Sequence, residues 1–156
     1  METIMEVSAL YEVAEIELSY KSKIKAANRP MIKSSKDAYE ILFKSWDENK
    51  IEFIEQFKVL FINRANRVLG IHEVSKGGIT GTVADPRIIF AGALKANCCG
   101  IILCHNHPSG NLKPSRQDEE LTQKIKQGGK ILDINLYDHL IISADGYYSF
   151  ADEGLL

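Results

Sequence analysis

A chain of 156 residues, 45% of them hydrophobic and 26% charged, is long enough to bury one hydrophobic core and is near the commonest size of a single domain. Its formal charge of -2 argues against the clearly basic surface of a nucleic-acid-binding domain. No stretch approaches the roughly 18 to 20 apolar residues of a membrane span, and the first residues lack the features of a secretory signal. We therefore expect a cytoplasmic protein with no membrane association.

The N-terminal part is interpreted as a strand followed by a polar connector. Apolar and polar residues alternate over 13–20, which indicates a strand with one buried face. The connector carries a basic cluster, which we interpret as a solvated segment, with contact to DNA as the less favoured alternative: Lys21, Lys23, Lys25 and Arg29. We assign residues 1–34 to this strand and connector and residues 35–156 to the main domain.

A helix and a hairpin are expected next. Ser34 and Ser35 can cap a helix whose core-facing residues recur at helical spacing: Ala38, Ile41, Leu42 and Trp46. Residues 57–62 then read as a buried strand, and residues 67–74 as its hairpin partner.

Helices and strands alternate in the rest of the chain. Asp85 and Pro86 form a good N-cap and first residue for a helix that leads to the apolar run 100–104. A second helix should begin near Ser115 and end at Gly128 and Gly129. Two short strands should follow, over residues 131–136 and 139–143, and a turn at residues 144–146 leads to residues 147–150. This order predicts an α/β fold: a single domain with a central mixed β-sheet flanked by helices.

Three cysteines lie close together, at Cys98, Cys99 and Cys104. Their odd number and their spacing fit neither a disulfide framework nor a paired zinc motif. Cys104 is one residue out of phase with the histidines that follow, so its side chain should face away from them. We interpret all three as small buried hydrophobic residues.

The strongest chemical signal is the pair His105 and His107, directly after the apolar run 100–104. Side chains at i and i+2 of a strand point the same way, so the two imidazoles should converge. A catalytic Zn²⁺ typically takes three nitrogen or oxygen ligands from the protein and leaves its fourth position to water. Asp118 would supply the third ligand. On its own, Asp118 also fits the third position of a helix capped by Ser115, and the two interpretations are compatible.

These residues resemble a known signature. His105-x-His107, followed by Ser115 and Asp118, matches the JAMM motif of the JAB/MPN metallopeptidases, and the sequence His-Asn-His-Pro-Ser-Gly over 105–110 resembles the RadC-like branch. The resemblance covers roughly the last hundred residues and implies an MPN/JAB fold with a cytidine-deaminase-like architecture. RadC-like proteins commonly carry a helical module before this domain, which the N-terminal part of this chain does not resemble.

The resemblance also implies a chemistry. It indicates a zinc metallopeptidase that hydrolyses amide bonds, with Ser115 stabilising the oxyanion and a glutamate acting as base. Glu55 best resembles that base, and Glu52 and Glu73 are its rivals. His139 is either a group behind the metal ligands or an ordinary buried histidine, while His72 looks like an ordinary hairpin residue.

Two other classes of function stay open at this point. Many MPN-fold proteins lack the metal residues and act as binding modules, but all three candidate ligands are present here. The RadC-like branch is also associated by name with DNA repair, which would make the protein an accessory of repair or of a mobile element. The near-neutral charge gives that role little support. The expected substrate is a protein or peptide, cleaved at a peptide or isopeptide bond.

Overall fold

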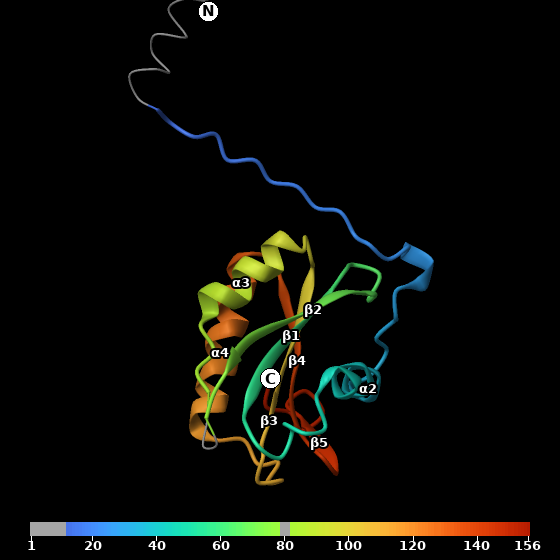
Figure 1. Cartoon of the computed structure of the whole chain (residues 1–156), viewed down its shortest axis with the longest axis vertical. Coiled ribbons are helices and arrows are strands. Elements are labelled where there is room, and N and C mark those ends of the chain that lie inside the picture. The colour runs from blue at the N-terminus through green and yellow to red at the C-terminus, as the bar shows by residue number, and fades with distance from the viewer. Residues whose placement is uncertain (1–11, 79–81) are drawn as a thin grey trace, which may run out of the picture.

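A five-stranded mixed sheet forms the middle of the computed structural model, which describes residues 12–78 and 82–156 (Figure 1). The strand order is β2-β1-β3-β4-β5, with β3 and β4 parallel and the other neighbours antiparallel. The strands are β1 (Gln56–Ile62), β2 (Val68–Lys76), β3 (Gly100–Asn106), β4 (Asn135–Ser143) and β5 (Gly146–Ser149). The predicted α/β fold with a central mixed sheet is confirmed.

Helices cover both faces of the sheet. Helices α3 (Pro86–Lys95) and α4 (Arg116–Ile131) lie on one face, and α2 (Ser35–Ser45) lies on the other (Figure 1). A short 3-10 helix, η1 (Ala26–Asn28), precedes α2. Because both faces are covered, β1 and β3 are buried at every residue rather than at alternate residues.

The two faces are built from alternate residues of the central strands. On β3, Ile101 and Leu103 pack toward α3 and α4, whereas Ile102 and Cys104 pack toward α2. Cys104 therefore faces away from the side of the sheet to which His105 belongs, as its phase predicts. All three cysteines are free; Cys98 and Cys104 are buried, and Cys99 is partly exposed.

Each of the three α-helices begins at a side-chain cap. The Ser34 hydroxyl accepts the Asp37 N–H, and Asp85 accepts the Arg87 N–H. At α4 the cap is Ser115. These caps satisfy backbone donors that the first turn of a helix leaves without partners. The three predicted helix starts are confirmed.

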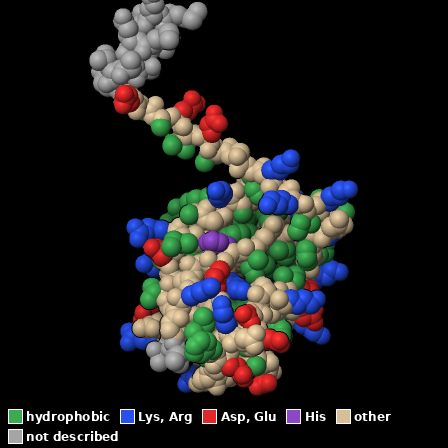
Figure 2. Space-filling model, viewed as in Figure 1, with side chains coloured by type: hydrophobic (Ala, Val, Ile, Leu, Met, Phe, Trp, Pro, Cys, Tyr) green, Lys and Arg blue, Asp and Glu red, His purple; other side chains and the backbone are tan. Residues whose placement is uncertain are grey.

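The strand expected over residues 13–20 is absent from the part of this segment that the structure describes. The segment has no strand partner, and Ile16 and Leu18 are 81% and 94% exposed. Its backbone leads away from the domain, and it carries acidic and apolar side chains (Figures 1 and 2). Alternation favours a strand only where a sheet edge supplies hydrogen bonds and one face is buried.

The strands expected over 131–136 and 139–143 also differ from the structure, because a single strand, β4, spans residues 135–143. The two expected strands left a gap at Tyr137 and Asp138, and charged residues seldom lie inside a buried strand. Its carboxylate accepts hydrogen bonds from the His139 N–H at 2.7 Å, the Ser149 hydroxyl at 2.6 Å and the Ala151 N–H at 3.0 Å. These partners hold the carboxylate within the strand. Burial still raises the pKa of Asp138 above its ordinary value.

The glycines expected to end α4 lie inside it, since the helix continues to Ile131. Gly129 is needed for close approach: the Ile134 N–H donates to the Gly129 carbonyl at 2.8 Å, and a Cβ at Gly129 would collide with the Ile134 carbonyl oxygen. A Cβ at Gly128 would instead meet the edge of the Phe90 ring, at 2.9 Å. A side chain can move more easily than a backbone carbonyl.

Gly129→Ala should therefore destabilise the domain by about 1–3 kcal/mol, although alanine is ordinarily the better helix former. The free energy of unfolding in urea measures this change. Gly128→Ala is the matched control and should cost clearly less. A Gly129→Ala variant as stable as the parent chain would show that the turn between α4 and β4 adjusts freely.

Candidate metal centre

The two histidines lie where β3 ends. His105 is the penultimate residue of the strand and 1% exposed, and the His107 N–H extends the pairing by donating to the Ile142 carbonyl at 3.0 Å. This continued pairing holds both side chains on the same side of the sheet. Their ring centroids lie 4.8 Å apart, and the two Nε2 atoms lie 3.0 Å apart.

The carboxylate of Asp118 reaches both rings from the first turn of α4. Its Oδ1 is 3.3 Å from His105 Nε2, and its Oδ2 is 3.4 Å from His107 Nε2. A capping box holds it there: the Ser115 hydroxyl accepts the Asp118 N–H at 3.0 Å, and Asp118 Oδ2 accepts the Ser115 N–H at 2.9 Å. The Asp118 side chain therefore takes part in the cap of α4 and approaches both histidines at the same time.

The separations in this cluster are close to those between ligands of a zinc ion. Bonds of about 2.0–2.1 Å at tetrahedral angles place neighbouring ligand atoms ~3.3 Å apart. The two Nε2 atoms lie 3.0 Å apart, and Asp118 presents a different oxygen to each ring, at 3.3 and 3.4 Å. His107 Nδ1 lies 2.6 Å from the Asn111 carbonyl, which can only accept, so in the neutral ring Nε2 carries the free lone pair. Such a lone pair beside carboxylate oxygens favours a cation between them.

The pKa shifts of this cluster show the same demand for positive charge. Burial alone would raise the pKa of Asp118, but its contacts with the rings of His105 and His107 outweigh burial and hold that pKa well below its usual range. Burial disfavours a charged His107, yet the Asp118 carboxylate and the Asn111 carbonyl raise its pKa. The cluster thus keeps its carboxylate ionised and stabilises a positive charge beside it.

Glu55 lies next to this cluster. It immediately precedes β1, and its backbone extends the hairpin by accepting the Gly77 N–H at 2.8 Å. A carboxylate oxygen of Glu55 and nitrogens of His105 and His107 lie within 4.8 Å of one another. Burial raises the pKa of Glu55, against the opposing effect of the two histidines.

The rival glutamates lie elsewhere. Glu73 is on β2, where it accepts a hydrogen bond from Gln56 and lies 3.6 Å from the Lys76 ammonium. Glu52 is exposed and only borders the cleft beside the metal cluster. The geometry favours Glu55 among the three candidates.

Asn106, which the sequence analysis did not single out, connects Glu55 to the metal cluster. Its side chain is fully buried on the face of β3 opposite the histidines. Its Oδ1 accepts the Gln56 N–H at 2.8 Å, and its Nδ2 donates to the carbonyls of Ile51 and Ile54, both at 2.8 Å. The loop before β1 is thereby fixed to the end of β3. The signal available in the sequence was an amide side chain between two candidate ligands, at a strand position that faces the opposite side of the sheet.

His139 and Thr122 lie behind His105. His139 is completely buried on β4, and its Nε2 is 2.8 Å from His105 Nδ1. Its Nδ1 is 2.7 Å from the Thr122 hydroxyl, on α4. Of the two interpretations offered for His139, the structure places it directly behind a candidate ligand. Thr122 carried no signal in the sequence, because its role depends on where α4 packs.

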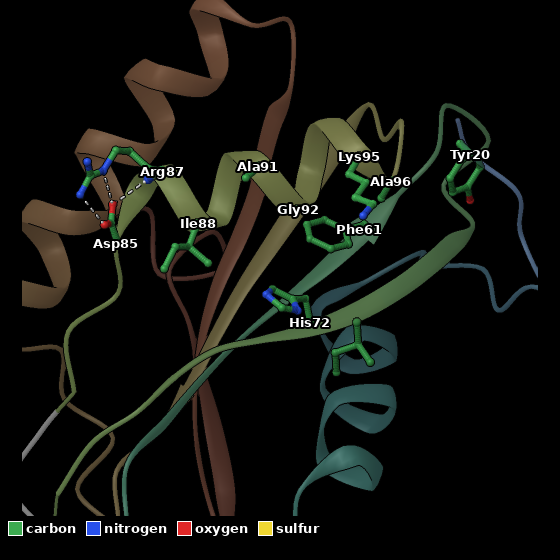
Figure 3. Close-up of a pocket in the computed structure, with 11 residues that line it drawn as sticks. Tyr20, Phe61, His72, Asp85, Arg87, Ile88, Ala91, Gly92, Lys95 and Ala96 are labelled. Atoms are coloured by element: carbon green, nitrogen blue, oxygen red, sulfur yellow. Dashed lines mark hydrogen bonds and ion pairs between the residues drawn. The ribbon is translucent and has the colours of Figure 1, made fainter. Parts of the chain in front are cut away.

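The candidate centre opens into a cleft of about 850 Å³. Its walls combine the polar groups of the site with apolar side chains such as Phe57, Ala84 and Leu121. A second, shallower hollow lies between α3 and β2 and contains His72 (Figure 3). Its only ion pair in the described ranges is the local one between Asp85 and Arg87, at 3.0 Å. The chemistry that the sequence predicts is thus concentrated in the cleft.

Asn106→Ala should lower the free energy of unfolding by about 1–3 kcal/mol or more, because it leaves up to three buried backbone groups without a partner. Urea denaturation measures the change. Asn49→Ala, at an exposed position of the same loop, is the control and should stay within about 0.5 kcal/mol of the parent chain. Equal stability of the two variants would mean that water replaces the Asn106 amide at no cost.

Comparisons with known proteins identify the family of the chain. The profile of the RadC-like JAB domain matches residues 32–155. A UPF0758 protein of Flavobacterium johnsoniae is 44% identical over 153 residues, which are 97% of this chain and 66% of the relative. A UPF0758 protein of Porphyromonas gingivalis is 46% identical over 103 residues, 65% of this chain and 45% of the relative.

The chain thus spans between about half and two-thirds of the length of these relatives, whose names state no activity. No helix in the described ranges has the length and apolar character needed to cross a bilayer. A domain match over most of the chain, a mixed α/β sheet and the clustered His, His and Asp side chains lead to one assignment. The chain belongs to the RadC-like JAB domain family.

Proposed function

We propose that this chain is a zinc-dependent hydrolase of amide bonds, acting on a peptide or isopeptide substrate. The observation that carries this proposal is the convergence of His105, His107 and Asp118, within 3.0–3.4 Å of one another, beside an open cleft. A structural zinc site is normally closed by four protein ligands, whereas a catalytic site keeps one position open. Three ligands at the margin of a cleft favour catalysis.

His105, His107 and Asp118 would hold the ion. When bound, zinc supplies Lewis acidity, which polarises a carbonyl and lowers the pKa of water toward ~7. The protein contributes the rigidity of the ligands, since β3 fixes both rings and the capping box fixes the carboxylate. Phe57 stacks on the His105 ring, with a centroid separation of 5.7 Å, and shields its inner side from water.

Glu55 is the proposed proton carrier. Its carboxylate lies near both histidines without taking part in the capping box, so it is free to accept a proton from water and pass it to the leaving nitrogen. Burial raises its pKa, which makes its protonated form easier to reach during the reaction. Asp118, whose pKa is lowered, suits the opposite role of a permanent anionic ligand.

Ser115 is the proposed oxyanion donor. Its oxygen accepts the Asp118 N–H, which leaves its own proton free, and the residue lines the same cleft as Glu55 and His107. A hydroxyl in this position can donate to the negative charge that develops on a carbonyl oxygen during attack. The N-cap and the oxyanion contact use different atoms of the same hydroxyl.

The alternative of a DNA accessory has weaker support. The whole chain carries a formal charge of -2, and on the face shown in Figure 2 basic side chains are interspersed with acidic and apolar ones. Phosphate binding normally uses a continuous basic surface.

Protein purified without added zinc should contain about one zinc ion per chain, and His107→Ala should contain much less, because one of three ligands is lost. Elemental analysis by mass spectrometry measures the content. Equal zinc content in both proteins would refute the proposed site.

Glu55→Gln is the matched variant for the base. It should keep its zinc while hydrolysis of an unstructured peptide mixture, followed by mass spectrometry, falls by about 10²–10⁴-fold. A zinc-loaded parent chain that cleaves no peptide or isopeptide mixture would contradict the substrate class, and an active Glu55→Gln variant would exclude Glu55 as base.

A further inference from the structure

The direction of every hydrogen bond behind His105 follows from one atom, the Thr122 hydroxyl oxygen. It lies 2.6 Å from the backbone carbonyl of Asp118, which can only accept, so the single hydroxyl proton points there. The same oxygen lies 2.7 Å from His139 Nδ1 and must accept from it. His139 therefore carries its proton on Nδ1 and none on Nε2.

The same reasoning continues to the candidate ligand. His139 Nε2 lies 2.8 Å from His105 Nδ1, and since the former has no proton, the latter must donate. With Nδ1 protonated, a neutral His105 ring has a free lone pair on Nε2, the atom that faces Asp118 and His107. A ring in the other tautomer would present a proton at that position and could not bind a metal ion.

We propose that Thr122 and His139 are positioning residues that hold His105 in its metal-binding tautomer. The inference rests on the proposed metal site. His105 belongs to a chain of hydrogen bonds that runs from the backbone of α4 to the candidate metal site. The Asp118 carbonyl at its start cannot donate, so it fixes the direction of each hydrogen bond in the chain. Asp118 takes part twice, with its carboxylate as a ligand and with its carbonyl as the fixed end of the chain.

The residues around this chain of hydrogen bonds exclude water from it. Thr122 and His139 are completely buried, and Phe150 stacks on the His139 ring with centroids 4.7 Å apart and planes within 9°. A neutral His139 has one donor and one acceptor, which is what a directed relay requires.

Thr122→Val removes the hydroxyl and keeps the side-chain shape, while Thr122→Ser keeps the hydroxyl. Nitrogen-15 NMR of the imidazole rings in metal-free protein should show the Nδ1–H tautomer of His139 in the parent chain and in Thr122→Ser. Thr122→Val should show a mixture of tautomers. Its zinc affinity, measured by competition with a chelator, should fall by about 10–100-fold, as expected for the loss of a partner behind a ligand.

A His139 Nε2–H tautomer in the parent chain, or a Thr122→Val variant with unchanged tautomer and zinc affinity, would overturn the inference. Failure of the metal site itself has a different signature. The parent chain would then bind no zinc, while the NMR of the metal-free protein still reports the direction of each hydrogen bond.

An independent inference concerns the outer edge of β2. Residues 30–32 already pair with its beginning, where the Val68 N–H donates to the Pro30 carbonyl at 2.8 Å and Met31 bridges Arg67. Beyond Val68, nothing in the described ranges pairs with the outer side of residues 69–76. Such an open edge can accept a further strand.

Residues 13–20 have the properties of that strand. They match residues 69–76 in length, and their apolar residues Ile16 and Leu18 are exposed in the isolated chain. Tyr20, at the end of this segment, already lines the hollow between β2 and α3 that Figure 3 shows. The match with the Flavobacterium johnsoniae relative covers 153 residues and so includes most of the chain before residue 32.

The hollow complements the segment in chemistry. Ile88 and Ala91 of α3 line it and suit the apolar face of residues 13–20.

We infer that residues 13–20 of a second copy of the chain add to the β2 edge, so that two copies exchange strands around a two-fold axis. A second copy is favoured over the same chain because the segment leads away from its own domain (Figure 1). Exchange of identical elements closes the assembly as a dimer and covers the β2 edge of each copy.

Light scattering of the 156-residue chain should give the mass of a dimer. Leu18→Glu should give a monomer because it places a charge on the buried face of the added strand, and Ile88→Lys on α3 should do the same. Ser19→Glu, which adds the same charge to the opposite face one residue away, is the control and should stay dimeric.

A monomeric parent chain would overturn the inference. Hydrogen exchange would then show whether residues 13–20 are protected by their own β2 edge or remain solvated.

Discussion

The capping box between Ser115 and Asp118 is the interaction on which the candidate centre depends. It satisfies the first turn of α4 and, with the same carboxylate, reaches the two histidine rings at the end of β3. A helix start is a rigid place for a ligand because its backbone is fixed by hydrogen bonds on both sides of the cap. Helix α4 is in turn held on the sheet by the apolar cluster that includes its Ile125 and Leu103 of β3.

Buried polar groups around this interaction are satisfied by partners from distant parts of the chain. Asn106 reaches the loop before β1, and His139 joins β4 to α4 through Thr122. Leaving such groups without partners would cost about 1–3 kcal/mol each, so the arrangement is stable only when all the elements are in place. The polar network thereby couples the geometry of the site to the completeness of the fold.

Two carboxylates in the same cleft are prepared for different roles by their surroundings. Asp118 lies between two rings and keeps its negative charge, whereas Glu55 lies farther away and burial makes its charge less favourable. This division separates a ligand from a proton carrier without any difference in the type of functional group. The ring of His105 is likewise distinguished from that of His139 only by its neighbours, because Nε2 of His105 faces Asp118 and His107 whereas His139 is enclosed by Phe57 and Phe150.

Local sequence determined much of this protein. The helix starts at Ser34, Asp85 and Ser115 follow from side chains that satisfy nearby backbone donors, and the hairpin and β3 follow from apolar runs between turn residues. The strand period placed His105 and His107 on one side and Cys104 on the other. Each of these features depends on contacts within a few residues, which a single sequence contains.

Tertiary structure decided the features that depend on partners distant in the sequence. Whether residues 13–20 form a strand depends on a sheet edge, and the continuity of β4 through Asp138 depends on Ser149 and Ala151. The choice of Glu55 over Glu73, and the roles of Asn106, Thr122 and His139, depend on which elements pack side by side. A hydrogen bond between distant residues leaves no periodic trace in the sequence, so only the packed chain brings its two ends together.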